Sequence, residues 1–163
     1  MLSLAVPMQQ AVMQQSSFEK QSSRPAPTPA RTGRRVPTII LADDSIFQRM
    51  MTRALLEAEG YHVLEAGNGR EVLELVRLTR PDLIVMDIAM PSMDGVTAAR
   101  RLRGANTAVA GVPIVFLTAL AASGDRDTAL AAGGNEYLVK PVGDRELLAV
   151  VRRYAGGDEG ADS

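Results

Sequence analysis

Five short apolar segments alternate with five segments of helical periodicity, and this alternation is the strongest constraint on the fold. The apolar segments predict strands at residues 37–42, 62–66, 83–86, 113–118 and 136–139. The other segments predict helices from residue 46 to 58 and at 70–79, 95–103, 122–132 and 144–154. Strands that alternate with helices form parallel sheets with right-handed crossovers. We therefore predict an α/β fold whose five parallel strands all end at one edge.

The first predicted helix is delimited by local signals. Asp43, Asp44 and Ser45 supply capping side chains before it, and Gly60 stops it. Its apolar positions fall at helical spacing and are Ile46, Met50, Ala54, Leu55 and Ala58. A stripe of this kind is expected to face the core.

The chain of 163 residues is long enough for one domain with tails. Residues 1–36 are rich in Gln, Ser, Pro and Ala and carry five basic groups and one acid. Such a composition buries too little apolar surface to fold alone, so residues 1–35 are predicted to be a disordered basic arm. The globular domain is predicted at residues 36–155, with a disordered acidic tail at 156–163.

Composition excludes several classes of function. The chain has no Cys, which excludes disulfides, thiol chemistry and thiolate metal sites. Residues 37–163 carry 13 basic and 18 acidic groups, so the folded part is not expected to bind nucleic acid. No apolar run approaches the roughly 20 residues needed to cross a bilayer. We expect a cytoplasmic protein that contacts neither a membrane nor, through this domain, a nucleic acid.

Polar side chains stand at the ends of four predicted strands. They are Asp43 and Asp44 after the first, Asp87 after the third, Thr118 at the end of the fourth and Lys140 after the fifth. Each alone is typical of a helix cap, a turn or a surface. Together they fall on the edge where open parallel α/β sheets bind ligands. The sequence therefore predicts a functional site at this edge.

Three neighbouring carboxylates require a cation, because they repel one another and one ammonium cannot balance them. Carboxylates, water and phosphate are typical ligands of Mg²⁺, whereas no His lies in the cluster to favour zinc. We predict that Asp43 and Asp44 hold Mg²⁺, with Asp87 as a further ligand. Asp87 is also placed to be a nucleophile that forms an acyl phosphate, and Lys140 and the metal would neutralise charge on the phosphoryl oxygens.

The same residues resemble the response-regulator receiver domain, the phosphoacceptor module of two-component signalling. The resemblance runs from about Val36 to Tyr154. The matching motifs, in order, are Leu-Ala-Asp43-Asp44-Ser, Asp87-Ile-Ala-Met-Pro-Ser-Met-Asp-Gly, Leu117-Thr118-Ala and Lys140-Pro141. The family implies a flavodoxin-like, doubly wound three-layer αβα sandwich with strand order 2-1-3-4-5. This order is known from a member of the family and is taken from the resemblance. It also implies a cis peptide bond between Lys140 and Pro141.

The resemblance assigns roles to the site residues. Asp87 becomes the phosphoacceptor, supported by Thr118 and Lys140, and the metal ligands become Asp43, Asp44, Asp87 and the backbone carbonyl of Ala89. The phosphodonor would be a sensor histidine kinase or a phosphotransfer protein. The expected activity is limited to phosphorylation from a phosphodonor and slow autodephosphorylation, so we do not expect an enzyme in the usual sense.

Thr118 and Tyr137 would be the switch pair by the same resemblance. The ring of Tyr137 would turn inward as Thr118 moves towards the phosphoryl group, and the small Ala119 leaves room for it. The output face would consist of the fourth helix (122–132), the fifth strand (136–139) and the fifth helix (144–154). Since a tail of only eight residues (156–163) follows the predicted domain, we expect a single-domain response regulator that resembles the chemotaxis regulators. It would act on a separate partner as a monomer or a weak phosphorylation-dependent dimer.

Two positions depart from the family pattern. Ala89 and Leu120 are apolar where the family places groups that flank the attacking water. We therefore expect slow or partner-assisted dephosphorylation.

Three alternatives share parts of this pattern. A nucleotide- or flavin-binding protein would need a Gly-rich turn where Asp43 and Asp44 stand. A phosphohydrolase would need a general acid beside Asp87 and a substrate-selecting cap. A receiver fold that no longer takes phosphate would have lost some acceptor residues.

Overall fold

The computed structural model describes residues 34–156, and the part from Val36 onward forms one unit. Its elements are β1 (Thr38–Ala42), α2 (Ile46–Ala58), β2 (His62–Ala66), α3 (Gly69–Thr79), β3 (Leu83–Met86), α4 (Gly95–Gly104), η1 (Ala108–Gly111), β4 (Ile114–Thr118), α5 (Ser123–Ala131), β5 (Glu136–Val139) and α6 (Asp144–Ala155). Every strand and helix predicted from the sequence is present, with ends within one residue of the prediction. The 3-10 turn η1 was not predicted. The proposed arm and tail fall outside the described residues except at their inner edges.

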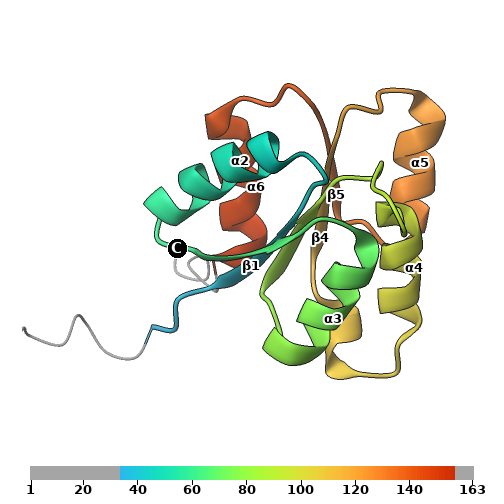
Figure 1. Cartoon of the computed structure of the whole chain (residues 1–163), viewed down its shortest axis with the longest axis horizontal. Coiled ribbons are helices and arrows are strands. Elements are labelled where there is room, and N and C mark those ends of the chain that lie inside the picture. Colours follow the sequence, from blue (N-terminus) through green and yellow to red (C-terminus); the bar gives the residue numbers. More distant parts are fainter. Residues whose placement is uncertain (1–33, 157–163) are drawn as a thin grey trace, which may run out of the picture. The chain divides into compact units, whose positions relative to one another are not determined.

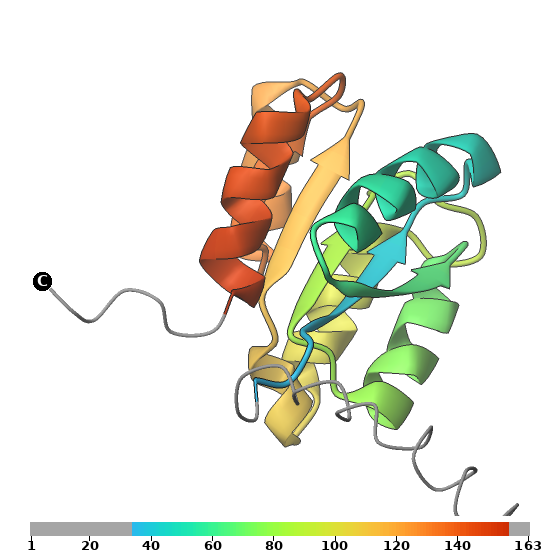
Figure 2. The same ribbon diagram turned by 90° about the vertical axis from the view of Figure 1, so that its left-hand side faces the viewer.

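The sheet has the order β2-β1-β3-β4-β5 and is parallel throughout, which confirms the predicted topology. Helices α2 and α6 cover one face, and α3, α4 and α5 cover the other (Figures 1 and 2). Alternate residues of β1 therefore enter different cores. Ile39 and Leu41 pack in the α2 and α6 layer, and Ile40 and Ala42 pack in the opposite layer.

The strand ends that carry the candidate site residues are aligned by the register. Ala42, the last residue of β1, pairs with Ala66 of β2 and Met86 of β3. Thr118, the last residue of β4, pairs with Val139 of β5. The residues that follow these strands consequently leave the sheet side by side.

The predicted inward face of α2 is wrong. Leu56 is the fully buried residue of this helix and Leu55 is half-buried, whereas Ile46 and Met50 are 73% and 55% exposed. Ala54 and Ala58 are exposed as well. Leu56 lies on the side of the helix that carries Arg49 and Thr52, both half-buried, so the buried side is not the apolar stripe, and the large apolar side chains of the first turns face outward.

An exposed apolar surface results on the first half of α2. It consists of Ile46, Phe47, Met50 and Met51, all more than half exposed. We call these four residues the α2 apolar face. A groove of about 670 Å³ lies between α2 and the connection from β5 to α6, and Phe47 and Met51 line it.

The entry to α4 fixes the loop that follows β3. Asp94 is the N-cap of α4, and its carboxylate accepts hydrogen bonds from the amide and hydroxyl of Thr97, both at 2.8 Å. Gly95 donates its amide to the carbonyl of Ile88 at 2.8 Å. A Cβ atom on Gly95 would collide with the carbonyl of Asp87, so only glycine allows this close approach.

At the other end of the sheet, Arg103 binds the segments that enter β4 and β5. Its guanidinium donates to the carbonyls of Gly133, Ala110 and Val112 and to the side-chain oxygen of Asn135, at 2.6–3.1 Å. All five N–H donors are used.

In residues 34–156 no helix is long and apolar enough to cross a membrane.

The cap at Asp94 predicts a pH-dependent contribution to stability. Partial burial raises the pKa of Asp94, but its hydrogen bonds with Thr97 outweigh burial and hold the pKa below its ordinary value. Asp94→Ala should lower the free energy of unfolding by about 1 kcal/mol at neutral pH. A lowered folded-state pKa gives stability above the unfolded-state value, so the difference should shrink as pH falls through the folded-state value. Urea unfolding across this pH range measures it. Asp94→Asn keeps an acceptor that does not titrate, so the difference in stability between Asp94→Asn and Asp94→Ala should not change with pH. A difference between wild type and Asp94→Ala that stays constant into acid would contradict the assignment.

Candidate functional site

Asp43, Asp44 and Asp87 lie together at the C-terminal edge of the sheet. Asp43 and Asp87 directly follow β1 and β3, and each is bound to the neighbouring strand: the amide of Asp43 donates to the carbonyl of Ala66 at 3.1 Å, and that of Asp87 to the carbonyl of Ala42 at 2.9 Å. One carboxylate oxygen from each of the three acids lies within 4.8 Å of the others. Asp43 is 6% exposed, whereas Asp44 faces solvent.

Lys140 joins this cluster from β5. Its ammonium donates to Asp43 Oδ2 at 2.6 Å and to Asp87 Oδ2 at 3.1 Å. Burial lowers the pKa of Lys140, but the hydrogen bonds and charges of Asp43 and Asp87 outweigh burial and leave the pKa above its ordinary value. Lys140 is therefore a charged ammonium that links the ends of β1, β3 and β5. The peptide bond to Pro141 is cis, as the resemblance implied.

Thr118 and Tyr137 share one partner, the main chain of Leu120. The hydroxyl oxygen of Thr118 accepts the amide of Leu120 at 3.3 Å, and the hydroxyl of Tyr137 donates to the carbonyl of Leu120 at 2.5 Å. Thr118 is fully buried and Tyr137 is 5% exposed, so the ring points inward in this structure. Burial raises the pKa of Tyr137, and the negative charge of Asp125 adds to the rise. The tyrosyl group is accordingly a neutral hydrogen-bond donor.

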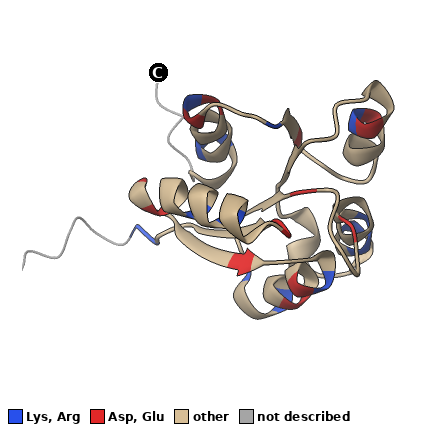
Figure 3. Cartoon of the chain, turned by 45° about the horizontal axis from the view of Figure 1, so that its top comes forward, with Lys and Arg blue, Asp and Glu red and all other residues tan. Residues whose placement is uncertain are grey.

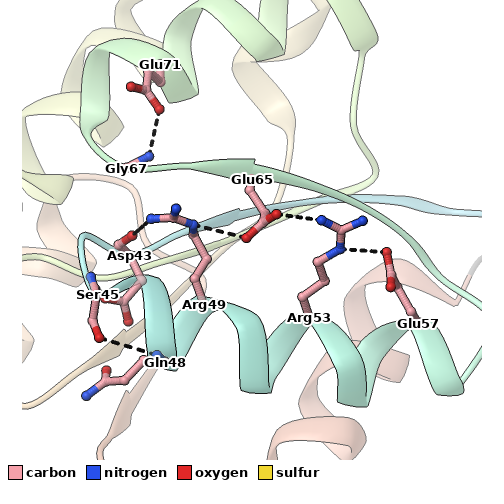
Figure 4. Close-up of polar contacts among 9 residues, drawn as sticks. All are labelled: Asp43, Ser45, Gln48, Arg49, Arg53, Glu57, Glu65, Gly67 and Glu71. Carbon is pink, nitrogen blue, oxygen red and sulfur yellow. Dashed lines mark hydrogen bonds and ion pairs between the residues drawn. The ribbon is translucent and has the colours of Figure 1, made fainter.

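A second set of contacts holds the loop of Asp43 from behind (Figure 4). Arg49 of α2 donates to the carbonyl of Asp43 at 2.6 Å and to Glu65 of β2 at 3.1 Å. Arg53 donates to Glu65 and Glu57, at 2.6 Å and 2.8 Å. This chain of charges ties the start of α2 to β2. The helices carry basic and acidic positions interspersed (Figure 3), and among residues 34–156 no second group of three acids lies this close together.

Two contacts close to the acids were not foreseen. Gln48 accepts the third N–H of the Lys140 ammonium at 2.5 Å, and Arg49 binds the Asp43 carbonyl. The position of Gln48, three residues after Ser45, indicates a local capping box rather than a long-range contact. The backbone carbonyl of Ala89 remains a predicted metal ligand. The structure shows a contact of its amide, which donates to Asp87 Oδ1 at 3.3 Å.

The donor set fits a hard divalent cation. Three carboxylates supply oxygens close enough together to share one ion, and one of them faces solvent, which leaves room for water ligands. Mg²⁺ prefers this combination of a few carboxylates and several waters. Asp43, Asp44 and Asp87 could hold the ion, and such an ion would neutralise negative charge on a phosphoryl group. The individual roles of these residues stay predictions.

Comparison with known proteins identifies the family. The model of the response regulator receiver domain matches residues 39–152. The chain belongs to this family.

The solved receiver domain of a sensor histidine kinase from Pseudomonas aeruginosa PAO1 has a similar structure, with a TM-score of 0.69 and 34% identity. The match covers 76% of this chain and all of that domain. That structure has a magnesium ion coordinated in its active-site cleft. The acidic cluster of this chain supplies carboxylate oxygens of the kind that such an ion prefers.

Curated relatives include both long and short proteins. The response regulator MprA of Mycobacterium sp. (strain KMS) is 39% identical over 128 residues, which are 77% of this chain and 54% of MprA. A 14.6 kDa protein of Leptolyngbya boryana is 40% identical over 116 residues, 71% of this chain and 88% of that protein. The chain spans about half the length of MprA and of the related ycf27 regulator of Cyanophora paradoxa.

The acidic cluster predicts magnesium binding that depends on Asp44. This side chain is exposed, so Asp44→Asn should disturb the fold little while removing an anionic ligand. We expect Mg²⁺ affinity to fall about tenfold or more, which corresponds to about 1.4 kcal/mol. Calorimetric titration after chelator treatment measures the affinity. Asp127→Asn, at an exposed position of α5, is the control and should bind like wild type. Equal affinity in both variants would remove Asp44 from the site.

Proposed function

We propose that this receiver domain accepts a phosphoryl group on Asp87 and uses it as a signal to a partner protein. The observation that carries the proposal is the Lys140 ammonium, which contacts both Asp43 and Asp87 beside a third acid. A cation already placed against the acceptor, with ligands for a metal next to it, is what phosphoryl transfer requires.

In the transfer step an Asp87 oxygen forms a bond to phosphorus while the bond from phosphorus to the donor breaks. With acetyl phosphate as donor, the product is the acyl phosphate of Asp87 and the leaving group is acetate. Lys140 stabilises negative charge on the phosphoryl oxygens, because its ammonium lies 3.1 Å from Asp87 Oδ2. The amide of Ala89 binds the other Asp87 oxygen and orients the carboxylate.

Leu120 connects the acceptor to the output surface. A Thr118 hydroxyl that turns to donate to a phosphoryl oxygen changes its contact with the Leu120 amide, and the Leu120 carbonyl is the partner of Tyr137. The signal would thus pass along the β4–α5 loop to the surface of α5, β5 and α6. A differential stabilisation of about 5.5 kcal/mol would convert a 1:99 population into 99:1.

The phosphodonor would be a protein with a phosphohistidine, from a sensor histidine kinase or a phosphotransfer protein. The α2 apolar face supports docking of a protein donor, because it is exposed and adjoins the groove that Lys140 also lines. The downstream partner is a separate protein in this proposal. Hydrolysis of the acyl phosphate would be slow, since the side chains of Ala89 and Leu120 have no polar group to orient water.

The phosphoacceptor assignment predicts the outcome of labelling with acetyl phosphate and Mg²⁺. The wild-type protein should gain one phosphoryl group, and Asp87→Asn should gain none because the amide is not a nucleophile. Intact-protein mass spectrometry detects the product. Asp127→Asn is the matched control and should label normally. Labelling that persists in Asp87→Asn would refute the assignment, as would the failure of wild type with every small phosphodonor.

The switch assignment predicts that labelling and response can be separated at Thr118. Thr118→Val keeps the volume of this buried residue but removes its hydroxyl. We expect this variant to accept a phosphoryl group, while the Tyr137 ring signal stays at its unphosphorylated position. Selective ¹³C labelling of the three tyrosines makes this signal visible by NMR. Thr128→Val, on the exposed side of α5, should respond like wild type. A wild-type shift in Thr118→Val would exclude Thr118 from the switch.

A further inference from the structure

Lys140 uses each of its three N–H donors on a different side chain. The acceptors are Asp43 Oδ2 at 2.6 Å, Gln48 Oε1 at 2.5 Å and Asp87 Oδ2 at 3.1 Å. A lysine side chain is long and flexible, so the direction of its ammonium depends on such acceptors. The three are not equivalent in the proposed reaction.

Two of the acceptors have other tasks. Asp43 already binds the Ser45 amide through Oδ1 at 2.9 Å, and its carboxylate belongs to the cluster that fits a divalent cation. An Asp43 oxygen engaged by a cation is less available to Lys140. Asp87 is the reacting group, and its contact is the longest of the three. Gln48 is the acceptor that neither reacts nor belongs to the acidic cluster.

The local structure explains why Gln48 is available. In a capping box, a Gln three residues after an N-cap Ser accepts the amide of that Ser. Here Ser45 accepts the Gln48 amide at 3.3 Å, but the Ser45 amide is taken by Asp43. The Gln48 side chain is therefore free to extend away from Arg49 (Figure 4). Its Oε1 accepts from the Lys140 ammonium. Its backbone lies in the first turn of α2, which gives it a fixed base.

We propose that Gln48 is a positioning residue that holds the Lys140 ammonium against Asp87, including when a cation engages Asp43. The proposal rests on the phosphoacceptor function proposed for Asp87. Gln48 itself contacts neither the phosphodonor nor the reacting oxygen. Lys140 stabilises negative charge on the phosphoryl oxygens during transfer. Loss of its positioning should therefore lower the maximal rate of phosphorylation more than the affinity for the donor.

The first test measures phosphorylation by acetyl phosphate in the full-length protein. Gln48→Met keeps the length of the side chain but has no strong acceptor. We expect its maximal rate to fall roughly three- to tenfold, the effect of one hydrogen bond, with an unchanged half-saturating donor concentration. Mg²⁺ affinity should equal that of wild type. Glu74→Met, on the exposed surface of α3, is the control. A wild-type rate in Gln48→Met overturns the proposal.

The second test observes the ammonium directly. The chain contains only two lysines, Lys20 and Lys140, so ¹⁵N-lysine labelling gives two side-chain signals, and Lys140→Met assigns them. Hydrogen-bonded ammonium protons exchange slowly with water. With Mg²⁺ present, Gln48→Met should speed this exchange at Lys140, whereas Gln48→Glu, which retains an acceptor, should keep it slow. Equal exchange in wild type and Gln48→Met overturns the proposal. If acetyl phosphate does not phosphorylate the wild-type protein, the proposed function fails. The exchange rate of the Lys140 ammonium protons then decides by itself whether Gln48 positions Lys140.

Discussion

The Lys140 ammonium is the interaction on which the arrangement of the site depends. It joins β5 to the acids that follow β1 and β3, strands that do not pair with β5. Without this charge, three carboxylates within 4.8 Å would repel one another and draw the loops apart. The parallel register brings the loops to one edge, and Lys140 reduces the repulsion between Asp43 and Asp87. The apolar sheet and the charged site are thus parts of one solution.

Most of the fold follows from patterns that act over short distances. Apolar runs and turn residues delimit each strand and helix, and the right-handed crossover then leaves few topologies. The site follows from the same rule, because Asp43, Asp87, Thr118 and Lys140 end strands that must point the same way. The structure brings these four residues together as the strand ends required.

The sequence failed where a long-range contact decides the outcome. Leu56 meets the sheet from the side of α2 that also carries Arg49 and Thr52, so the apolar periodicity indicates the wrong side, and Met50 faces outward. The spacing of Ser45 and Gln48 indicates a local capping box. Only the structure shows that Asp43, and not Gln48, accepts the Ser45 amide. The contacts of Leu120 with Thr118 and Tyr137 could not be predicted for a different reason: its backbone makes them, whereas the sequence pattern concerns its side chain.

Arg103 has a consequence for how the domain deforms. Its guanidinium fastens together the segments through which β4 and β5 enter the sheet, and a lysine has too few donors to replace it. Gly133 is also confined there, since a Cβ atom would meet the Arg103 side chain. These two strands are anchored at one end, whereas their other ends carry Thr118 and Lys140. Any rearrangement of β4 and β5 at the site would therefore pivot about the end that Arg103 holds.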